Sequence, residues 1–232
     1  MFLSRNSLDD LFSLLFPNLC CGCGTSLFTG EAHLCSRCVY HLPYTDHHLH
    51  DANKVARQFW GRIPCHAAMA MLFFKKGGNV QQIIHHLKYS HKPELGLKLG
   101  ELLGERLATA PSYQQLDLLV PVPLHKKRER QRGYNQSACI AEGISRILKV
   151  PMSKFQLIRN IPTDSQTKKG RYLRFENMLK AFEVKDESQL KGKHILLVDD
   201  VLTTGATLEA CGLELLKCGI QKLSIATLAF VG

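Results

Sequence analysis

The sequence predicts an α/β domain with a mostly parallel sheet covered by helices on both faces, preceded by a small zinc-ribbon-like module. From residue 60 onward, short apolar segments of strand character alternate with segments of helical period, which is typical of a parallel sheet. Residues 18–45 hold five of the nine cysteines and show little hydrophobic periodicity. The composition of 45% hydrophobic and 22% charged residues excludes wholesale disorder.

The chain divides into four predicted regions. Residues 1–17 form an amphipathic helix, because the apolar residues between 8 and 16 share one helical face and Pro17 follows. This helix packs either on its own domain or on another protein. Residues 18–45 are the cysteine-rich module, residues 46–59 are a polar linker, and residues 60–232 are the α/β domain.

The elements of the α/β domain follow in order. The apolar run 67–74 predicts a strand, and a helix capped by Asn79 with a second helix over 95–107 follows. The rest of the pattern predicts a strand over 116–122, a helix over 137–148, a strand over 155–158, a polar loop over 160–170 and a strand over 181–184. A buried strand over 194–198, a helix over 206–218 and a strand over 222–230 complete the domain.

Two features indicate the compartment. The longest uninterrupted apolar stretch has eight residues, 67–74, whereas a membrane helix needs about 18–20. The N-terminus lacks the cleavage site of a signal peptide. We therefore expect a soluble, cytoplasmic protein. An odd number of cysteines without signs of export favours metal ligation or free thiols over disulfides.

The cysteine spacing predicts a structural zinc site. Cys20 and Cys23 form one C-x2-C pair, and Cys35 and Cys38 form the second after eleven intervening residues. Each pair of thiolates can hold one edge of a zinc tetrahedron, and four thiolates leave no open position for catalysis. Cys21 is a spare thiol, although it could replace Cys20 as a ligand. A redox role for the pairs is the less favoured alternative.

The segment after residue 194 carries the strongest chemical signal. A buried strand leads into Asp199 and Asp200, at the edge where open α/β sheets bind ligands. A turn into a helix follows, whose backbone N–H groups and hydroxyls suit a phosphate; it contains Thr203, Thr204, Gly205, Ala206 and Thr207. The acids then face ribose hydroxyls and a divalent metal. The segment predicts a sugar-phosphate site.

Positive charge is concentrated in one window. Residues 121–180 hold 14 Lys and Arg against 4 Asp and Glu, whereas the flanking stretches are nearly balanced. Such a localised field favours a polyanion, either a phosphorylated metabolite or a nucleic acid. Residues 125–132 follow the strand over 116–122, and the polar segment 159–177 could close over the site.

The string from His194 to Thr207 closely resembles the phosphoribosyl pyrophosphate signature of type I phosphoribosyltransferases. The resemblance implies that Asp199 and Asp200 hold the ribose hydroxyls and that Thr203 to Thr207 hold the 5′-phosphate. It also implies a pyrophosphate loop with Leu124, His125 and Lys126, and catalytic roles for Asp199, Asp200, Lys126 and Arg171. Thr203 stands where hypoxanthine and guanine salvage enzymes carry a carboxylate, which argues against that activity.

The order of motifs resembles the ComF/GntX family: a four-cysteine module, PVPLH with RGYNQ, a T-x-x-Q-T segment, and LVDDVLTTGAT. That family implies binding of phosphoribosyl pyrophosphate with Mg²⁺ and a role in natural competence on incoming single-stranded DNA, with a protein of the competence machinery as a further partner. The zinc spacing lies within the family's looser range.

Three functional classes stay open. The first is a phosphoribosyltransferase whose acceptor the sequence does not identify. The second is a nucleic-acid-binding module that retains the ligand site as a sensor or relic, with Tyr134, Tyr172 and Phe175 as stacking surfaces among the cations. A ligand-responsive regulator is less favoured, because no helix-turn-helix segment is present in the sequence.

Overall fold

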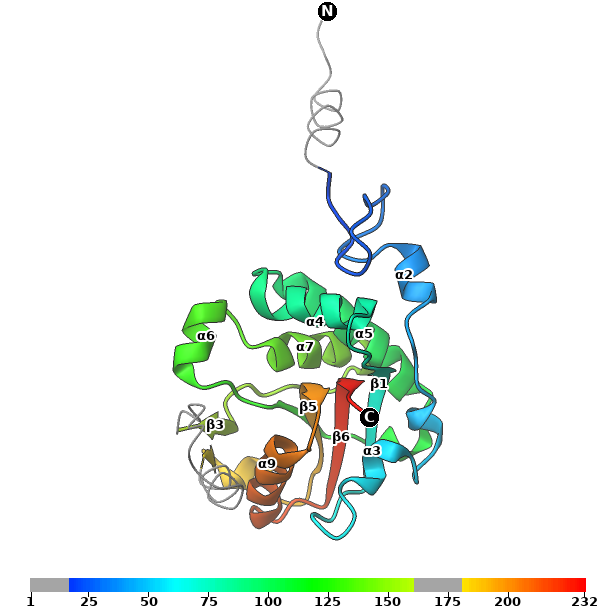
Figure 1. Cartoon of the computed structure of the whole chain (residues 1–232). Helices are drawn as coiled ribbons and strands as arrows, with labels where there is room; N and C mark the ends of the chain where they lie inside the picture. Colours follow the sequence, from blue (N-terminus) through cyan, green and yellow to red (C-terminus); the bar gives the residue numbers. More distant parts are fainter. Residues whose placement is uncertain (1–16, 161–180) are drawn as a thin grey trace, which may run out of the picture.

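The computed structural model describes residues 17–160 and 181–232. Its centre is a four-stranded sheet in the order β1-β6-β5-β2, in which every neighbouring pair is parallel (Figure 1). The strands are β1 (Ala67–Phe73), β2 (Leu118–Pro121), β5 (His194–Leu202) and β6 (Lys222–Phe230). All of β6 after Lys222 is buried, as expected for a central parallel strand covered on both faces.

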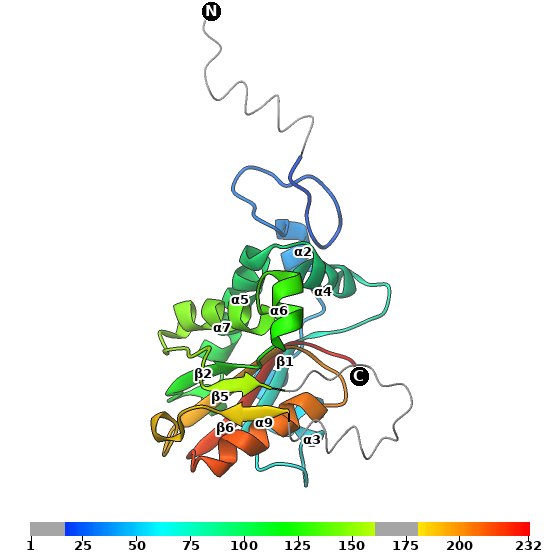
Figure 2. The same ribbon diagram turned by 90° about the vertical axis from the view of Figure 1, so that its left-hand side faces the viewer.

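Helices cover both faces of this sheet (Figures 1 and 2). One face packs against α4 (Asn79–Tyr89), α5 (Pro93–Ala108) and α7 (Gln136–Leu148), and the other against α3 (Lys54–Arg57) and α9 (Ala206–Lys217). The strands alternate accordingly, since Met69 and Met71 belong to the first core and Ala68 and Ala70 to the second. The predicted α/β fold class is confirmed.

The remaining elements are short. They are α2 (Ser36–Tyr40), α6 (Lys126–Arg132), the antiparallel pair β3 (Leu157–Arg159) and β4 (Phe182–Val184), and the 3-10 helices η1 (His47–Leu49), η2 (Pro111–Tyr113) and η3 (Glu187–Gln189). The sequence pattern did not predict α6, whose residues include no buried side chain.

Some boundaries differ from the predicted ones. Gly78, not Asn79, is the N-cap of α4, and β5 continues through the two aspartates to Leu202. The segment predicted as a linker contains η1 and α3, and it buries Val55 and Phe59 in the second core. Its few apolar residues are enough to anchor it to the sheet.

Helices α5 and α7 touch backbone to backbone. A Cβ on Gly100 would overlap the carbonyl oxygen of Ile140, and a Cβ on Gly143 would overlap that of Leu97. Only glycine permits this approach. The contact fixes the position of α7, whose first turn lies against the C-terminal half of β5.

The cysteine-rich module lies beside α4 (Figure 2). Cys20, Cys21 and Leu34 share one apolar core with Val80 and Ile83 of α4. The predicted helix over residues 1–17 lies outside the described residues, apart from Pro17. Within residues 17–160 and 181–232, none of the helices has the length and hydropathy that crossing a bilayer requires.

Candidate functional site

Strand β5 carries the predicted acidic pair near its carboxyl end. One Asp199 carboxylate oxygen accepts hydrogen bonds from the Ser137 hydroxyl, at 2.8 Å, and from the Asp200 backbone N–H, at 2.9 Å. Burial, together with the neighbouring Asp200 carboxylate, raises the pKa of Asp199 to about 7. The pair therefore holds a proton readily near neutral pH, and a cation brought to it would be stabilised.

A cation from α4 already reaches this pair. Lys88 Nζ lies 2.9 Å from Asp200 Oδ2, and both side chains are largely buried. The sequence analysis did not identify Lys88, which is more than a hundred residues from Asp200 along the chain. A single lysine near the end of a predicted helix carries no motif, so the sequence holds no signal for this contact.

The loop after β5, predicted to bind a phosphate, lines a small pocket. Thr203 to Thr207 line this pocket together with Asp199, and α9 begins within it at Ala206. Gly205 has a φ of 76°, and a Cβ there would lie 3.2 Å from the Phe59 ring, so a larger residue would be strained. The N-terminus of a twelve-residue helix next to small hydroxyl side chains suits an anion.

Arg62 braces this loop from the other side. Its Nη1 donates to the Thr204 carbonyl oxygen at 3.0 Å, and its Nε donates to Glu209 Oε2 at 3.0 Å. Glu209 is buried in the first turn of α9. Arg62 thus ties the loop to the helix that follows it. Arg62 could not be predicted from the sequence, because a single arginine far from the loop carries no motif.

The predicted pyrophosphate loop lies next to the aspartates. Pro121 pairs with Val198, and the Val122 N–H donates to the Val198 carbonyl oxygen at 2.8 Å. Asn135, the N-cap of α7, donates to the Val122 carbonyl oxygen at 3.0 Å and so holds the turn. Leu124 and His125 follow directly in this turn and are half-buried.

Lys126 begins α6 rather than lying in an open loop. The His125 side chain caps this helix by accepting a hydrogen bond from the Lys127 N–H at 3.2 Å. The other predicted catalytic cation, Arg171, lies outside the described residues. The structure therefore brings together the acidic pair, the loop after β5 and the turn after β2, whereas their chemical roles stay predictions.

Helix α6 concentrates exposed positive charge. Lys126, Lys127, Arg128 and Arg130 are exposed and form no ion pair with any residue within the described ranges. Tyr134, predicted as a stacking residue, instead packs against the first core and donates its hydroxyl to the Leu87 carbonyl oxygen. Tyr172 and Phe175 lie outside the described residues.

The four predicted ligand cysteines form a cluster. The sulfur atoms of Cys20, Cys23, Cys35 and Cys38 all lie within 4.8 Å of one another, and the Cys23 and Cys35 sulfurs are 3.7 Å apart. A tetrahedral zinc–thiolate site needs sulfur–sulfur distances of roughly 3.8 Å. The donor set and its spacing could hold a metal and fit zinc.

The backbone around the cluster suits thiolates. The N–H groups of Gly22 and Cys35 point at Cys20 Sγ, at 3.4 and 3.3 Å. Gly22 leaves room for the cluster, since a Cβ there would lie 3.1 Å from Cys38 Sγ. Cys21 is buried outside the cluster, with Lys92 Nζ 3.8 Å from its sulfur. The arrangement favours Cys20 over Cys21 as the ligand.

The class of protein follows from the parallel sheet and its acidic edge. Residues 135–232 match the family model described as "Phosphoribosyl transferase domain". This range includes β5, both aspartates and the loop into α9. This part of the chain is therefore similar to a phosphoribosyl transferase domain.

Some relatives can be aligned over a larger part of the chain than the family model covers. The "DNA utilization protein YhgH" of Escherichia coli is 29% identical over 91% of this chain and 96% of that protein. The "Competence protein F" of Haemophilus influenzae is 30% identical over 63% of this chain and 66% of that protein. The "Competence protein ComFC" of Bacillus subtilis is 38% identical over 44% of this chain and 39% of that protein. The chain is similar to these three proteins, and its predicted resemblance to the ComF/GntX family is confirmed.

Proposed function

We propose that this protein binds phosphoribosyl pyrophosphate with Mg²⁺ at the edge of its parallel sheet and serves the handling of incoming single-stranded DNA in natural competence. The main support for this ligand is that Asp199 and the loop of Thr203 to Thr207 line one pocket. The names of the relatives, which refer to DNA utilization and to competence, support the biological role.

The residues divide the ligand among them. Asp199 and Asp200 would accept hydrogen bonds from the ribose hydroxyls and would hold the metal. The N–H groups and hydroxyls of the loop after β5 bind the 5′-phosphate, as helix N-termini do. The turn with Leu124, His125 and Lys126 lies beside the acids and faces the pyrophosphate, whose negative charge Lys126 would offset. Mg²⁺, when held by Asp199 and Asp200, would neutralise part of the negative charge of the bound ligand.

Two assignments accompany this site. In an enzyme, an acceptor nucleophile would form a bond to the anomeric carbon while the bond to pyrophosphate breaks and pyrophosphate leaves with the electron pair. In the cysteine-rich module, Cys20, Cys23, Cys35 and Cys38 hold a structural zinc ion, which stabilises a segment with little core of its own.

The test is calorimetric titration of phosphoribosyl pyrophosphate into the full chain, first with Mg²⁺ and then with EDTA. We expect metal-dependent binding in the micromolar range, lost in Asp199→Asn with Asp200→Asn and kept in the control Asp46→Asn, which changes an exposed acid far from the site in sequence. Absence of binding at millimolar ligand would contradict the proposal.

The second candidate is a nucleic-acid-binding module that keeps the site as a non-catalytic sensor or relic. The four exposed cations of α6, which have no acidic partner among the described residues, favour it. The two candidates differ in pyrophosphate release. A transferase releases pyrophosphate when its acceptor is present, whereas a sensor binds the ligand and returns it intact. Assay of pyrophosphate with nucleobases and with DNA as acceptors separates them.

A further inference from the structure

An exposed tyrosine at the end of α4 has two planar groups beside it. Tyr89 is 60% exposed. The His85 ring lies 4.9 Å from the Tyr89 ring, and the Arg132 guanidinium lies over the Tyr89 ring at 5.5 Å. Arg132 is itself held by the Gln136 side chain at 2.8 Å. The ends of α4 and α6 thus bring three flat groups together in a small platform.

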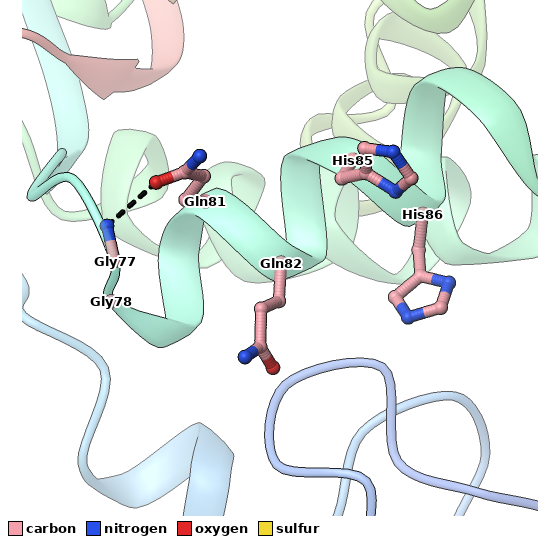
Figure 3. A pocket seen from close by; sticks show the side chains of 6 residues that line it. All are labelled: Gly77, Gly78, Gln81, Gln82, His85 and His86. Carbon is pink, nitrogen blue, oxygen red and sulfur yellow. Dashed lines mark hydrogen bonds between the residues drawn. The ribbon is translucent and has the colours of Figure 1, made fainter.

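The platform continues into a polar pocket along α4. Gly77, Gly78, Gln81, Gln82, His85 and His86 line this pocket, so that His85 belongs to both features (Figure 3). Figure 3 shows Gln82 and His86 pointing from α4 toward the N-terminal module. The Gly77 N–H donates to Gln81 Oε1 at 2.6 Å and fixes one wall. The pocket offers amide and imidazole groups that can exchange hydrogen bonds with base edges.

Positive charge stands at both ends of this surface. Lys75 and Lys76 precede the pocket and are exposed, and α6 adds its exposed cations beyond Tyr89. None of these lysines and arginines has an acidic partner among the residues that the structure places. A surface with unpaired cations around a stacking group complements a phosphodiester backbone with accessible bases.

We propose that this surface, the α4–α6 strip, binds single-stranded DNA with one base stacked on Tyr89. The strip consists of Lys75, Lys76, Gln81, Gln82, His85, Tyr89, Lys126, Lys127, Arg128, Arg130 and Arg132. A base presents its flat face to a side chain only when the strand is unpaired, which selects single strands over duplex. The inference deepens the proposed function by giving its DNA partner a place, and it does not depend on binding of phosphoribosyl pyrophosphate.

The strip also lies next to the acidic site. Lys88 precedes Tyr89 directly and contacts Asp200, and α6 begins one residue after His125 in the turn beside the acids. A strand on the α4–α6 strip would therefore pass along the rim of the sugar-phosphate site. DNA and phosphoribosyl pyrophosphate would bind side by side, and Lys126 is the one residue assigned to both sites.

Fluorescence anisotropy with a labelled oligo-dT tests the stacking. We expect Tyr89→Ala in the full chain to weaken binding by about five- to hundredfold, as for the loss of one stacked base, and Tyr89→Phe to bind like the wild type. Tyr40→Ala is the matched control, because Tyr40 is 81% exposed and lies on α2, outside the strip. Equal affinities of wild type and Tyr89→Ala would overturn the proposal.

Further arms distinguish other occupants. Trp60, 62% exposed with Arg57 over its ring, is the competing aromatic site; a loss confined to Trp60→Ala would overturn the assignment to Tyr89. A duplex of the same length should bind more weakly and be insensitive to Tyr89→Ala. Tighter binding of oligo-U than of oligo-dT, with the same dependence on Tyr89, would overturn the assignment to DNA.

The salt dependence tests the charges separately. Reversing Lys126, Lys127, Arg128 and Arg130 to glutamate should lower the slope of log affinity against log salt by about 3, given roughly 0.7 per phosphate contact on a single strand. An unchanged slope would overturn the role of α6.

Calorimetry on the same proteins keeps this inference apart from the proposed function. Tyr89→Ala should bind phosphoribosyl pyrophosphate as the wild type does. If the wild type does not bind phosphoribosyl pyrophosphate but Tyr89→Ala binds DNA more weakly than the wild type, the sugar-phosphate site is contradicted and the α4–α6 strip is supported. If the ligand binds and DNA affinity is insensitive to Tyr89, the strip falls and the sugar-phosphate site stands.

Discussion

Lys88 Nζ lies 2.9 Å from Asp200 Oδ2, which joins the last turn of α4 to the acidic edge of the sheet. The ammonium group occupies part of the space where a divalent metal or a sugar hydroxyl would approach Asp200. Because Lys88 offsets some of the negative charge of the pair, it lets two adjacent carboxylates lie together in a largely buried place. A ligand cation would have to share Asp200 with Lys88 or displace it.

Replacing Lys88 should therefore strengthen binding of Mg²⁺ alone. In Lys88→Met the competing ammonium is gone and the aliphatic stem is kept. We expect the Mg²⁺ affinity, measured by titration without nucleotide or sugar phosphate, to rise by up to about fivefold, which corresponds to about 1 kcal/mol. Lys98→Met, which removes an exposed lysine near Glu101, serves as the control and should leave Mg²⁺ affinity unchanged. A weaker Mg²⁺ affinity in Lys88→Met would show that Lys88 supports the metal site.

The pKa of Asp199 predicts a pH-dependent stability. The folded protein raises this pKa to about 7, so the native state binds a proton more tightly than the unfolded chain does. Stability contributed by this group is fully present below about pH 4, the pKa of the unfolded side chain, and is lost as the pH rises from there through about 7. Asp199→Asn keeps an acceptor for the Ser137 hydroxyl and removes the charge.

Thermal unfolding across pH checks this expectation. At pH 8 the Asp199→Asn variant should melt at a higher temperature than the wild type, by about 2–4 °C for each kcal/mol of relieved charge burial. The difference should shrink as the pH falls and become small near pH 4, about the pKa of the unfolded side chain. A lower melting temperature at pH 8 would contradict the raised pKa. Asp46→Asn, at an exposed position, controls for the general loss of one negative charge.

The brace made by Arg62 predicts a split between stability and ligand binding. Arg62→Ala leaves the buried Glu209 without its partner, which should cost about 3 kcal/mol of unfolding free energy, the lower end for a buried pair. It also frees the Thr204 carbonyl oxygen, so the affinity for phosphoribosyl pyrophosphate should fall.

A double variant separates the two effects. Arg62→Met with Glu209→Gln removes the unpaired charge and should recover most of the stability, while the loop stays unbraced and ligand affinity stays low. Arg146→Ala breaks an exposed i,i+4 pair with Glu142 and should change stability by under about 0.5 kcal/mol. Recovery of ligand affinity in the double variant would show that Arg62 acts only through stability.

Two adjacent cysteines give a matched test of the metal centre. Cys20 belongs to the four-sulfur cluster and Cys21 does not. Cys20→Ser should lower bound zinc from one ion per chain toward zero, whereas Cys21→Ser should retain it, as measured by elemental analysis of the purified proteins. Equal loss in both variants would contradict the assignment. Because the module shares a core with α4, chelation should also shift the melting of the main domain.

The sheet and its acidic edge could be predicted because local pattern determines them. The run 195–198 is apolar throughout and leads directly into Asp199 and Asp200, and buried parallel strands have this pattern. The loop after β5 could also be predicted, because its glycine marks a turn. Gly205 indeed has a left-handed conformation at the start of α9. Both features lie within one short segment of the chain.

Contacts between distant segments could not be predicted in the same way. Lys88 and Arg62 reach the site only after the sheet has ordered its strands, and a single lysine or arginine has no sequence signature. Helix α6 could not be predicted from hydrophobic periodicity, because it has no apolar face. Its caps were nevertheless visible, with His125 at the start and Gly133 in a left-handed conformation at the end.

The supposed linker shows the same limit at a smaller scale. Asn53 caps α3 and donates its side-chain amide to the Ala68 carbonyl oxygen of β1 at 2.8 Å. Val55 and Phe59 then enter the core. A polar composition concealed this anchoring, because three well-placed residues are enough to attach a short segment to a sheet.

The glycine contact between α5 and α7 has a consequence for how natural variation in this chain should be interpreted. Gly100 and Gly143 touch neither the acids nor the loop after β5, but α7 carries the Ser137 hydroxyl that holds Asp199. A side chain at either glycine would push the two helices apart and move that hydroxyl. In a survey of strains, a change at one of these glycines would disable the acidic edge from beneath while every residue of the edge remained intact.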